Sequence, residues 1–287
     1  MITKTTTESP LTNAEYHALD SVSNTKLKTF RESRKLYHAR HVAKTLAFKQ
    51  TPAMQLGSIV HAMTFEPENI TQLYAVPPKC DRRTNVGKAI WNEFLESAPE
   101  GCEVVDADTW QQAHDIHSAL IASPIMRSFM DAFGKCEEPL FWTDPATGLE
   151  CRSKIDKLCR ELDVIIDLKV VMDSTPSGFA RAVVGFEYDC QAAWYMDGYK
   201  ANFGEVPNFV FVAVSKTAPY EIGFYELNED DLAAARVTNS QTLASLKACM
   251  ETGDWKSQHE TSVVSLKLPR YAQYRSDYTQ FSESNDQ

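Results

Sequence analysis

Two predicted strands near the middle of the chain carry acidic and basic residues at a spacing that could support metal chemistry. The first strand covers residues 149–158 and contains Asp156. The second covers residues 163–171 and contains Asp167 and Lys169. Side chains alternate between the two faces of a strand, so Asp167 and Lys169 share one face. A tight turn between the strands places Asp156 directly opposite Asp167.

This pair of aspartates is suited to holding a divalent cation. Opposed Cβ atoms in an antiparallel pair lie about 4.5–5.5 Å apart. Two carboxylates at that separation repel, so one must take a proton or a cation must lie between them. Magnesium prefers one or two carboxylates together with water and phosphate oxygens. Lys169 could then orient or activate a water, or neutralise charge on a phosphoryl oxygen. The alternative is a half-exposed hairpin on which Asp167 and Lys169 are merely solvated.

The elements around this hairpin change character once along the chain. Apolar periodicity predicts helices in the first half, at residues 23–44, 52–65, 86–97 and 107–122. Strands predominate in the second half, at residues 140–143, 149–158, 163–171, 208–216 and 220–227. The predicted helices of that half begin at Pro176, run over residues 187–203 to Gly204, and begin after Asn228.

The order of these elements predicts an α/β protein with an N-terminal helical extension. We divide the chain into a disordered tail (1–13), an N-terminal helical part (14–135), a strand-rich core (136–270) and a polar C-terminal tail (271–287).

Composition excludes several classes of protein. The chain has 287 residues, 43% of them hydrophobic and 24% charged, as in an ordinary globular protein. The net charge of −10 argues against a generic nucleic-acid coat. The longest apolar run, residues 209–214, is far shorter than the roughly 20 residues that span a bilayer, so no membrane partner is expected.

The pattern of cysteines and glycines limits which cofactors the protein is expected to bind. Seven scattered cysteines without a C-x-x-C pair argue against a disulfide framework, a zinc ribbon and an iron–sulfur cluster, and favour reduced thiols in the cytoplasm. Cys151 and Cys159 are expected to be buried as small apolar residues. No glycine-rich phosphate cradle is present, so no ATP requirement is expected.

Basic residues gather in three segments that could line a path for DNA. Residues 26–44, 79–88 and 151–160 together carry +12, and the rest of the chain carries −22. For residues 26–44 the alternative is a solvated helix face. No base-reading element is evident, so sequence-independent contacts to the DNA backbone are expected. The candidate DNA-binding residues are Arg82, Arg83, Thr84, Lys88, Arg152 and Lys154.

The arrangement Asp156 … Asp167-Leu168-Lys169 resembles the D … (D/E)-x-K core of the PD-(D/E)xK nuclease superfamily. More specifically, residues 16–268 resemble the RecE-type exonucleases (exonuclease VIII) and their phage relatives. Besides the hairpin, the resemblance rests on Ser21-Val-Ser-Asn-Thr-Lys-Leu27, Gly57-Ser-Ile-Val-His61, Arg83-Thr84 … Gly87-Lys88 and Asp189-Cys-Gln-Ala-Ala-Trp-Tyr195. It implies a restriction-endonuclease-like core, with a central mixed sheet flanked by helices.

The resemblance also implies roles for individual residues. Asp156 and Asp167 would be metal ligands, the Leu168 carbonyl would complete the inner shell, and Lys169 would be the catalytic lysine. Ile155 stands where relatives often carry proline, and this departure removes no chemical group.

Four further positions have both a functional and a structural interpretation. His61 corresponds to a helix histidine that approaches a metal, but on its apolar helix it could be an ordinary core histidine. Gln191 and Tyr195 correspond to a motif that orients substrate or lysine, but they could be an interface pair one helical turn apart. Glu137 is a candidate metal ligand or a supporting carboxylate.

The implied function is a Mg²⁺-dependent 5′-to-3′ exonuclease that degrades one strand of linear double-stranded DNA, with Mn²⁺ as a substitute metal. The 3′ tails would serve recombination by a single-strand annealing protein of the RecT type. Relatives form rings around DNA, so a closed homo-oligomer is expected. The alternatives are a structure-specific or restriction-like endonuclease on the same core and a catalytically inactive DNA-binding subunit.

Overall fold

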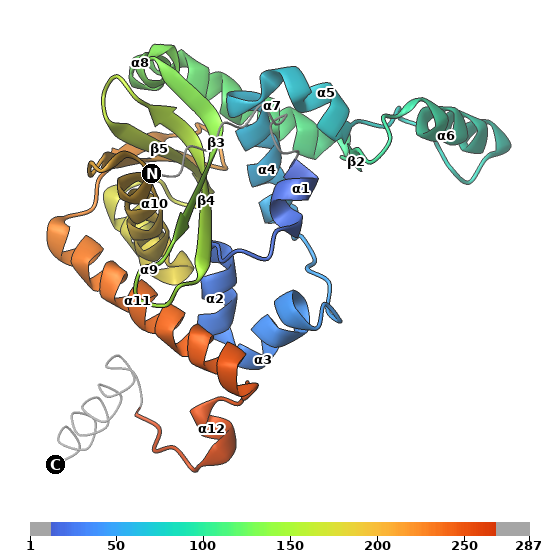
Figure 1. Ribbon diagram of the computed structural model, residues 1–287. Helices are drawn as coiled ribbons and strands as arrows, with labels where there is room; N and C mark the ends of the chain where they lie inside the picture. The colour runs from blue at the N-terminus through green and yellow to red at the C-terminus, as the bar shows by residue number, and fades with distance from the viewer. Residues whose placement is uncertain (1–12, 268–287) are drawn as a thin grey trace, which may run out of the picture.

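The computed structural model describes residues 13–267 and is built around a five-stranded mixed sheet (Figure 1). Its strands lie in the order β3 (Gly134–Thr143), β4 (Glu150–Cys159), β5 (Val164–Val171), β6 (Asn208–Ser215) and β7 (Ile222–Tyr225). Only β5 and β6 are parallel neighbours, and the connection between them contains α9 (Pro176–Phe186) and α10 (Tyr188–Phe203).

Helices cover both faces of this sheet. Those before the sheet are α1 (Asn13–Ala18), α2 (Asn24–Glu32), α3 (Arg34–Tyr37), the π-helix η1 (His38–Val42), α4 (Pro52–Phe65), the 3₁₀ helix η2 (Pro67–Asn69), α5 (Ile70–Leu73), α6 (Asn85–Ser97), α7 (Ala107–Ala122) and α8 (Pro124–Asp131). Those after it are α11 (Glu229–Thr252) and α12 (Gln258–Thr261). Two short parallel strands, β1 (Tyr74–Ala75) and β2 (Glu103–Val104), flank α6, which projects from the body (Figure 1).

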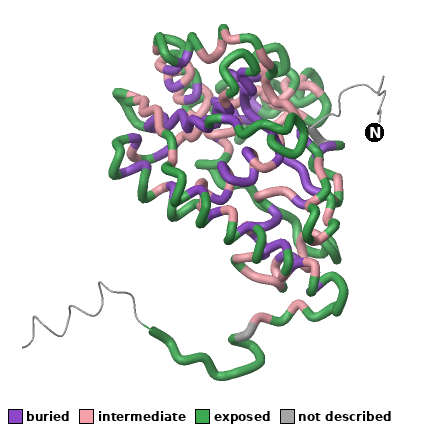
Figure 2. Tube along the Cα trace, turned by 60° about the vertical axis from the view of Figure 1, so that its left-hand side comes forward, coloured by how far each residue is buried: buried purple, intermediate pink, exposed green. Residues whose placement is uncertain are grey.

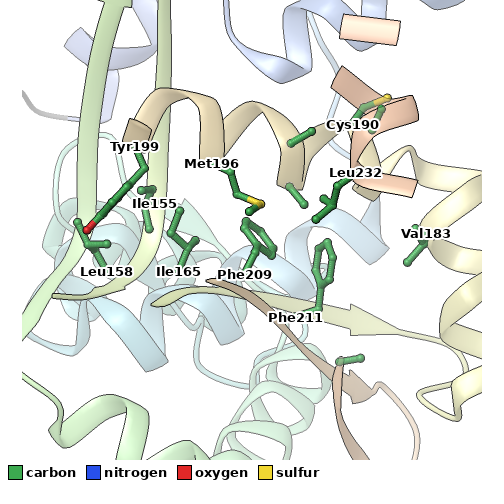
Figure 3. Packing of buried hydrophobic residues seen from close by; sticks show 14 of the residues in the cluster. Ile155, Leu158, Ile165, Val183, Cys190, Met196, Tyr199, Phe209, Phe211 and Leu232 are labelled. Atoms are coloured by element: carbon green, nitrogen blue, oxygen red, sulfur yellow. The ribbon is translucent and has the colours of Figure 1, made fainter. Parts of the chain in front are cut away.

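One face of the sheet packs against α9, α10 and α11. Apolar residues of β5 and β6, among them Ile165, Phe209 and Phe211, meet Met196 of α10 and Leu232 of α11 (Figure 3). Because side chains alternate along a strand, the intervening positions face the other way. Gln191 and Tyr195 of α10 lie on the first of these two faces.

The opposite face packs against α4, α7 and α8. Here Ile166, Val210 and Val212 of the sheet meet Ile59 of α4 and Ile116 of α7. A third cluster joins α2 to α10 and α11 and includes Leu27, Phe30, Trp194 and Leu246. Figure 2 shows the buried residues gathered inside the body, whereas residues 259–267 are exposed.

The predicted fold class is confirmed: the protein has a mixed sheet flanked by helices. The helix predicted at residues 23–44 is wrong as one element, because Ser33 adopts an extended conformation. Its hydroxyl accepts a hydrogen bond from the Leu36 N–H and so starts a new helix. Strand β3 begins at Gly134, six residues earlier than predicted.

Several smaller expectations can be compared with the structure. Cys151 and Cys159 are buried, as predicted. The predicted tails, residues 1–13 and 271–287, lie outside the described residues except for residue 13. Within the described part of the chain, no helix is long and apolar enough to cross a membrane.

Candidate metal and catalytic site

Three carboxylates occupy one row across the sheet. In the β3–β4 ladder, the pairs on either side of Glu137 and Asp156 keep one register, so these two residues stand opposite each other. The β4–β5 ladder ends at the pair Lys157 and Ile166, one row before Asp156 and Asp167. The predicted hairpin register is therefore correct, and it places an acidic residue of β3 in the same row.

The sheet is distorted at this row. Glu137 has a left-handed backbone (φ 54°), which is uncommon for a residue other than glycine. The Leu168 N–H donates to Asp156 Oδ2 at 2.8 Å, so a side-chain carboxylate replaces the backbone acceptor expected in a regular ladder. Ladder pairing between β4 and β5 ends here, and a fork opens between them.

His61 of α4 joins two of the three carboxylates. Its Nε2 lies 2.8 Å from Asp156 Oδ2, and its Nδ1 lies 3.2 Å from Glu137 Oε1. One ligand atom from each of the three residues falls within 4.8 Å of the others, a grouping that could hold a metal ion. Lys154 of β4 pairs with the other oxygen of Glu137 at 2.5 Å.

Asp167 lies at the face covered by α10. It is fully buried, and its Oδ2 pairs with the ammonium of Lys169, whose side chain is 13% exposed. Gln191 Nε2 lies 3.1 Å from Asp167 Oδ1 and also 3.1 Å from the hydroxyl of Tyr195. The predicted face shared by Asp167 and Lys169 is therefore observed, and α10 supplies a donor for the carboxylate.

Burial and neighbouring charges shift the pKa values of these groups. Burial raises the pKa of Asp167 to about 6, although Lys169 opposes the shift. Burial opposes the charge on His61, but the Asp156 carboxylate raises the pKa of this imidazole to about 9. Burial would raise the pKa of Asp156, but the His61 charge holds it below its usual value. In the metal-free protein the proton therefore resides on the histidine.

The residues present fit a divalent cation. Three carboxylates face three cationic groups, His61, Lys154 and Lys169, which neutralise the site when His61 is protonated. Glu137 Oε1 and Asp167 Oδ2 are buried without a hydrogen bond, although each faces a cation. Carboxylate oxygens and an imidazole nitrogen are common ligands of divalent metals.

The structure brings most of the predicted site residues together. His61, Glu137 and Asp156 form one group, and Asp167, Lys169, Gln191 and Tyr195 form the adjoining group. The predicted metal ligand Leu168 connects them through its backbone N–H. Their catalytic and metal-binding roles stay predictions.

The prediction that Arg152 contacts DNA is wrong. Arg152 is 3% exposed, and its Nη1 donates to the carbonyls of Leu19 and Ser21 and to the Ser21 hydroxyl at 2.7–2.9 Å. Its guanidinium carbon also lies 4.9 Å from the Tyr16 ring centroid. Arg152 therefore ties the segment before α2 to β4. Lys154 is held inside the site by its ion pair with Glu137.

The other candidate DNA-binding residues lie at the base of α6. Arg83 has a 91% exposed side chain and pairs with Asp81, whereas Arg82 lies 4.3 Å from the Trp91 ring centroid. Thr84 caps α6 by accepting from the Gly87 N–H. Lys88 follows on the exposed surface of that helix. DNA contact by these four residues stays a prediction.

In two of the three basic segments, several charged side chains bond to groups within the protein. Lys26 donates to the carbonyls of Leu19 and Asp20, both at 2.9 Å. In the 151–160 segment, Lys157 is buried and donates to the Met130 carbonyl at 3.3 Å. These cations do not line a DNA path, and the +12 of the three segments overstates the charge available to DNA.

Tyr188, the first residue of α10, also reaches the site and was not predicted. The Lys169 ammonium lies 4.9 Å from its ring centroid. A signal was present in the sequence, because Tyr188, Gln191 and Tyr195 are three and four residues apart and share one helix face.

The fold and the site geometry together define a nuclease-type domain of the PD-(D/E)xK superfamily. The chain matches the family model "PDDEXK-like domain of unknown function (DUF3799)" over residues 21–263, and it belongs to this family. A search of curated proteins found no match.

Two solved structures are similar to this chain. One is the crystal structure of a "Putative exonuclease" from Eubacterium rectale, with a TM-score of 0.61 and 17% sequence identity, covering 91% of this chain and 96% of that one. At this identity the likeness supports the fold alone. The other is the crystal structure of SSO0001, with a TM-score of 0.31 and 14% sequence identity, covering 69% of this chain and 88% of that one.

Proposed function

We propose that the protein is a Mg²⁺-dependent exonuclease that degrades linear double-stranded DNA from 5′ to 3′. The observation that carries the proposal is the row Glu137, Asp156 and Asp167 with Lys169 beside it at the fork between β4 and β5. Such a site can bind a divalent cation and present an ammonium to a phosphodiester. The 5′-to-3′ direction rests on the resemblance to RecE-type exonucleases.

Asp156 and Asp167 would hold the cation, with His61 and Glu137 within reach of it. A bound divalent cation supplies a Lewis acid, which lowers the pKa of a water and neutralises phosphate charge. The Lys169 ammonium would stabilise negative charge on a phosphoryl oxygen or hold the attacking water. Gln191 fixes Asp167 through Oδ1, and the Leu168 N–H fixes Asp156.

The proposal includes further points that rest on the resemblance. The products would be 3′ single-stranded tails for an annealing protein of the RecT type, in the cytoplasm, and Mn²⁺ would substitute for Mg²⁺. The proposal also includes a closed homo-oligomer around DNA. Val86 and Ile90, one turn apart on the projecting α6, are exposed apolar residues that a neighbouring copy could cover.

Labelled DNA ends test this function. Linear duplex labelled at the 5′ or the 3′ end is incubated with Mg²⁺, with Mn²⁺ or with EDTA, beside a covalently closed circle. The proposal expects early release of the 5′ label, an intact circle and no reaction in EDTA. Cutting of the circle would instead support an endonuclease.

Lysine variants test the active site in the same assay. Lys169→Ala should lower turnover to a small residual rate, whereas Lys247→Ala, at a half-buried lysine of α11, should leave it unchanged. Equal slow release of nucleotides by Lys169→Ala and the wild type would support a catalytically inactive DNA-binding subunit.

A further inference from the structure

The ammonium of Lys169 has an aromatic neighbour besides its carboxylate partner. Its Nζ lies 4.9 Å from the ring centroid of Tyr188, within the range of a cation–π interaction. The Asp167 carboxylate contacts the same ammonium. Since the Lys169 side chain is only 13% exposed, a contact with the ring is screened less by water than one at the surface.

The Tyr188 ring is held by other aromatic rings. It stacks on Phe186 with centroids 5.5 Å apart and on Phe179 with centroids 6.3 Å apart. It also lies 6.2 Å from the Phe211 ring of β6. Such aromatic contacts favour one orientation of the ring. The Tyr188 side chain therefore presents a fixed aromatic surface to Lys169.

The backbone that delivers Tyr188 is strained and clamped. Glu187 has left-handed dihedrals (φ 58°, ψ 41°), which a residue other than glycine adopts at a cost. Its Oε2 accepts from Arg31 Nε and Nη2 of α2 at 2.9 and 2.7 Å, and Arg31 Nη1 lies 3.3 Å from Asn239 Oδ1 of α11. Lys28 of α2 donates to the Phe186 carbonyl at 2.9 Å. Helices outside the hairpin thus fix the corner between α9 and α10.

We propose that Tyr188 is a positioning residue for Lys169, held in place by the pair Arg31 and Glu187. The ring attracts the ammonium and restricts it to the side of the site where Asp167 lies. The inference rests on the proposed function, because it assumes that Lys169 acts on the phosphodiester. Tyr188 itself does not touch the reacting atoms.

Three substitutions test the positioning role through kcat. Tyr188→Leu removes the ring, and a lost cation–π interaction corresponds to a fall in kcat of about 2- to 30-fold, with KM for DNA little changed. Tyr188→Phe keeps the ring and should stay within about twofold of the wild type. The control Phe133→Leu removes an exposed ring that lies outside the Tyr188 stack, and it should leave kcat unchanged. Equal losses in the leucine variants would overturn the proposal.

A double-mutant cycle separates positioning from a general structural effect. In a Lys169→Ala background, Tyr188→Leu should no longer lower the residual single-turnover rate, because the group that it positions is gone. An undiminished effect in that background would overturn the proposal. A Lys169→Ala variant with the wild-type rate would contradict the proposed function itself.

Nuclear magnetic resonance gives a readout that needs no turnover. With ¹³Cε-labelled lysine in the metal-free protein, the Lys169 ε-proton signals, assigned from Lys169→Arg, should be shifted upfield by the ring. Tyr188→Leu should remove this shift and Tyr188→Phe should keep it. The same signals in the wild type and in Tyr188→Leu would show that the ring does not hold the ammonium and would overturn the proposal, whatever the nuclease assay shows.

Discussion

Replacing Arg152 by alanine should destabilise the fold and leave the affinity for DNA unchanged. Arg152 Nη1 donates to the carbonyls of Leu19 and Ser21 at 2.7 Å each and to the Ser21 hydroxyl at 2.9 Å. The side chain is buried, so its removal takes this donor from the Ser21 carbonyl and hydroxyl, whereas the Leu19 carbonyl keeps its bond from Lys26 Nζ. The segment before α2 would then lose its side-chain tie to β4, although the backbone bond from the Arg152 N–H to the Val22 carbonyl remains.

The expected loss follows from these contacts. A hydrogen bond from a charged group contributes about 1.5–3 kcal/mol, and three bonds made by one nitrogen are not additive. An opposing contribution comes from Lys26, whose pKa is lowered to about 8 by burial and by repulsion from Arg152, so that removing Arg152 relieves some repulsion. We therefore expect a loss of about 3 kcal/mol in the free energy of unfolding. This is a substantial share of the roughly 5–15 kcal/mol typical of native proteins.

Urea unfolding and DNA binding, measured on the same preparations, test this reasoning. The matched variant is Arg83→Ala, which removes an arginine whose side chain is 91% exposed. Arg152→Ala should lower the urea midpoint at unchanged slope. Arg83→Ala should leave the midpoint in place and reduce the salt dependence of DNA binding by about one phosphate contact. Wild-type stability together with weaker DNA binding in Arg152→Ala would refute the structural role of Arg152.

Three other perturbations have defined outcomes. The pKa of His61 is raised from an ordinary 6.5 to about 9, so in EDTA its protonation stabilises the fold fully below pH 6.5, and this stabilisation is lost as the pH rises through 9. Urea midpoints measured between pH 6 and 10 should show this decline, and His61→Gln should flatten it. Mg²⁺ at 100 times its Kd should stabilise the wild type by about 2.7 kcal/mol in thermal unfolding, and a similar gain in Asp156→Asn would contradict the assigned site. Gln191→Leu removes the donor to Asp167 and should lower kcat about 10- to 150-fold; an unchanged kcat would restrict Gln191 to packing.

Local patterns predicted much of the sheet and the hairpin correctly. Apolar alternation and the turn position predict the pairing of β4 with β5, and the observed register puts Asp156 and Asp167 in one row as predicted. The sequence predicts the first strand only from residue 140, so Glu137 falls outside it, whereas in the structure Glu137 lies within β3. Its left-handed backbone is a tertiary outcome that its side-chain type does not reveal.

Charged residues were the least predictable part of the site. Arg152 and Lys154 are two positions apart on one strand, and the sequence predicts DNA contact for both. In the structure one bonds to backbone carbonyls and the other pairs with Glu137. A sequence shows that a cation is present but not whether backbone oxygens from a distant segment will surround it. Structural cations can be told from DNA-binding cations by their burial, and burial is known only once the packing is known.

The N-terminal helices form part of the site. α4 places His61 between Asp156 and Glu137, α2 clamps the corner before α10 through Arg31, and the segment preceding α2 is tied to β4 by Arg152. Each contact acts on a different element around the β4–β5 fork. The division at residues 135 and 136 therefore separates helical from strand-rich sequence but does not mark a functional boundary. The hairpin alone holds Asp156, Asp167 and Lys169, and the groups that neutralise and orient these side chains lie on other elements.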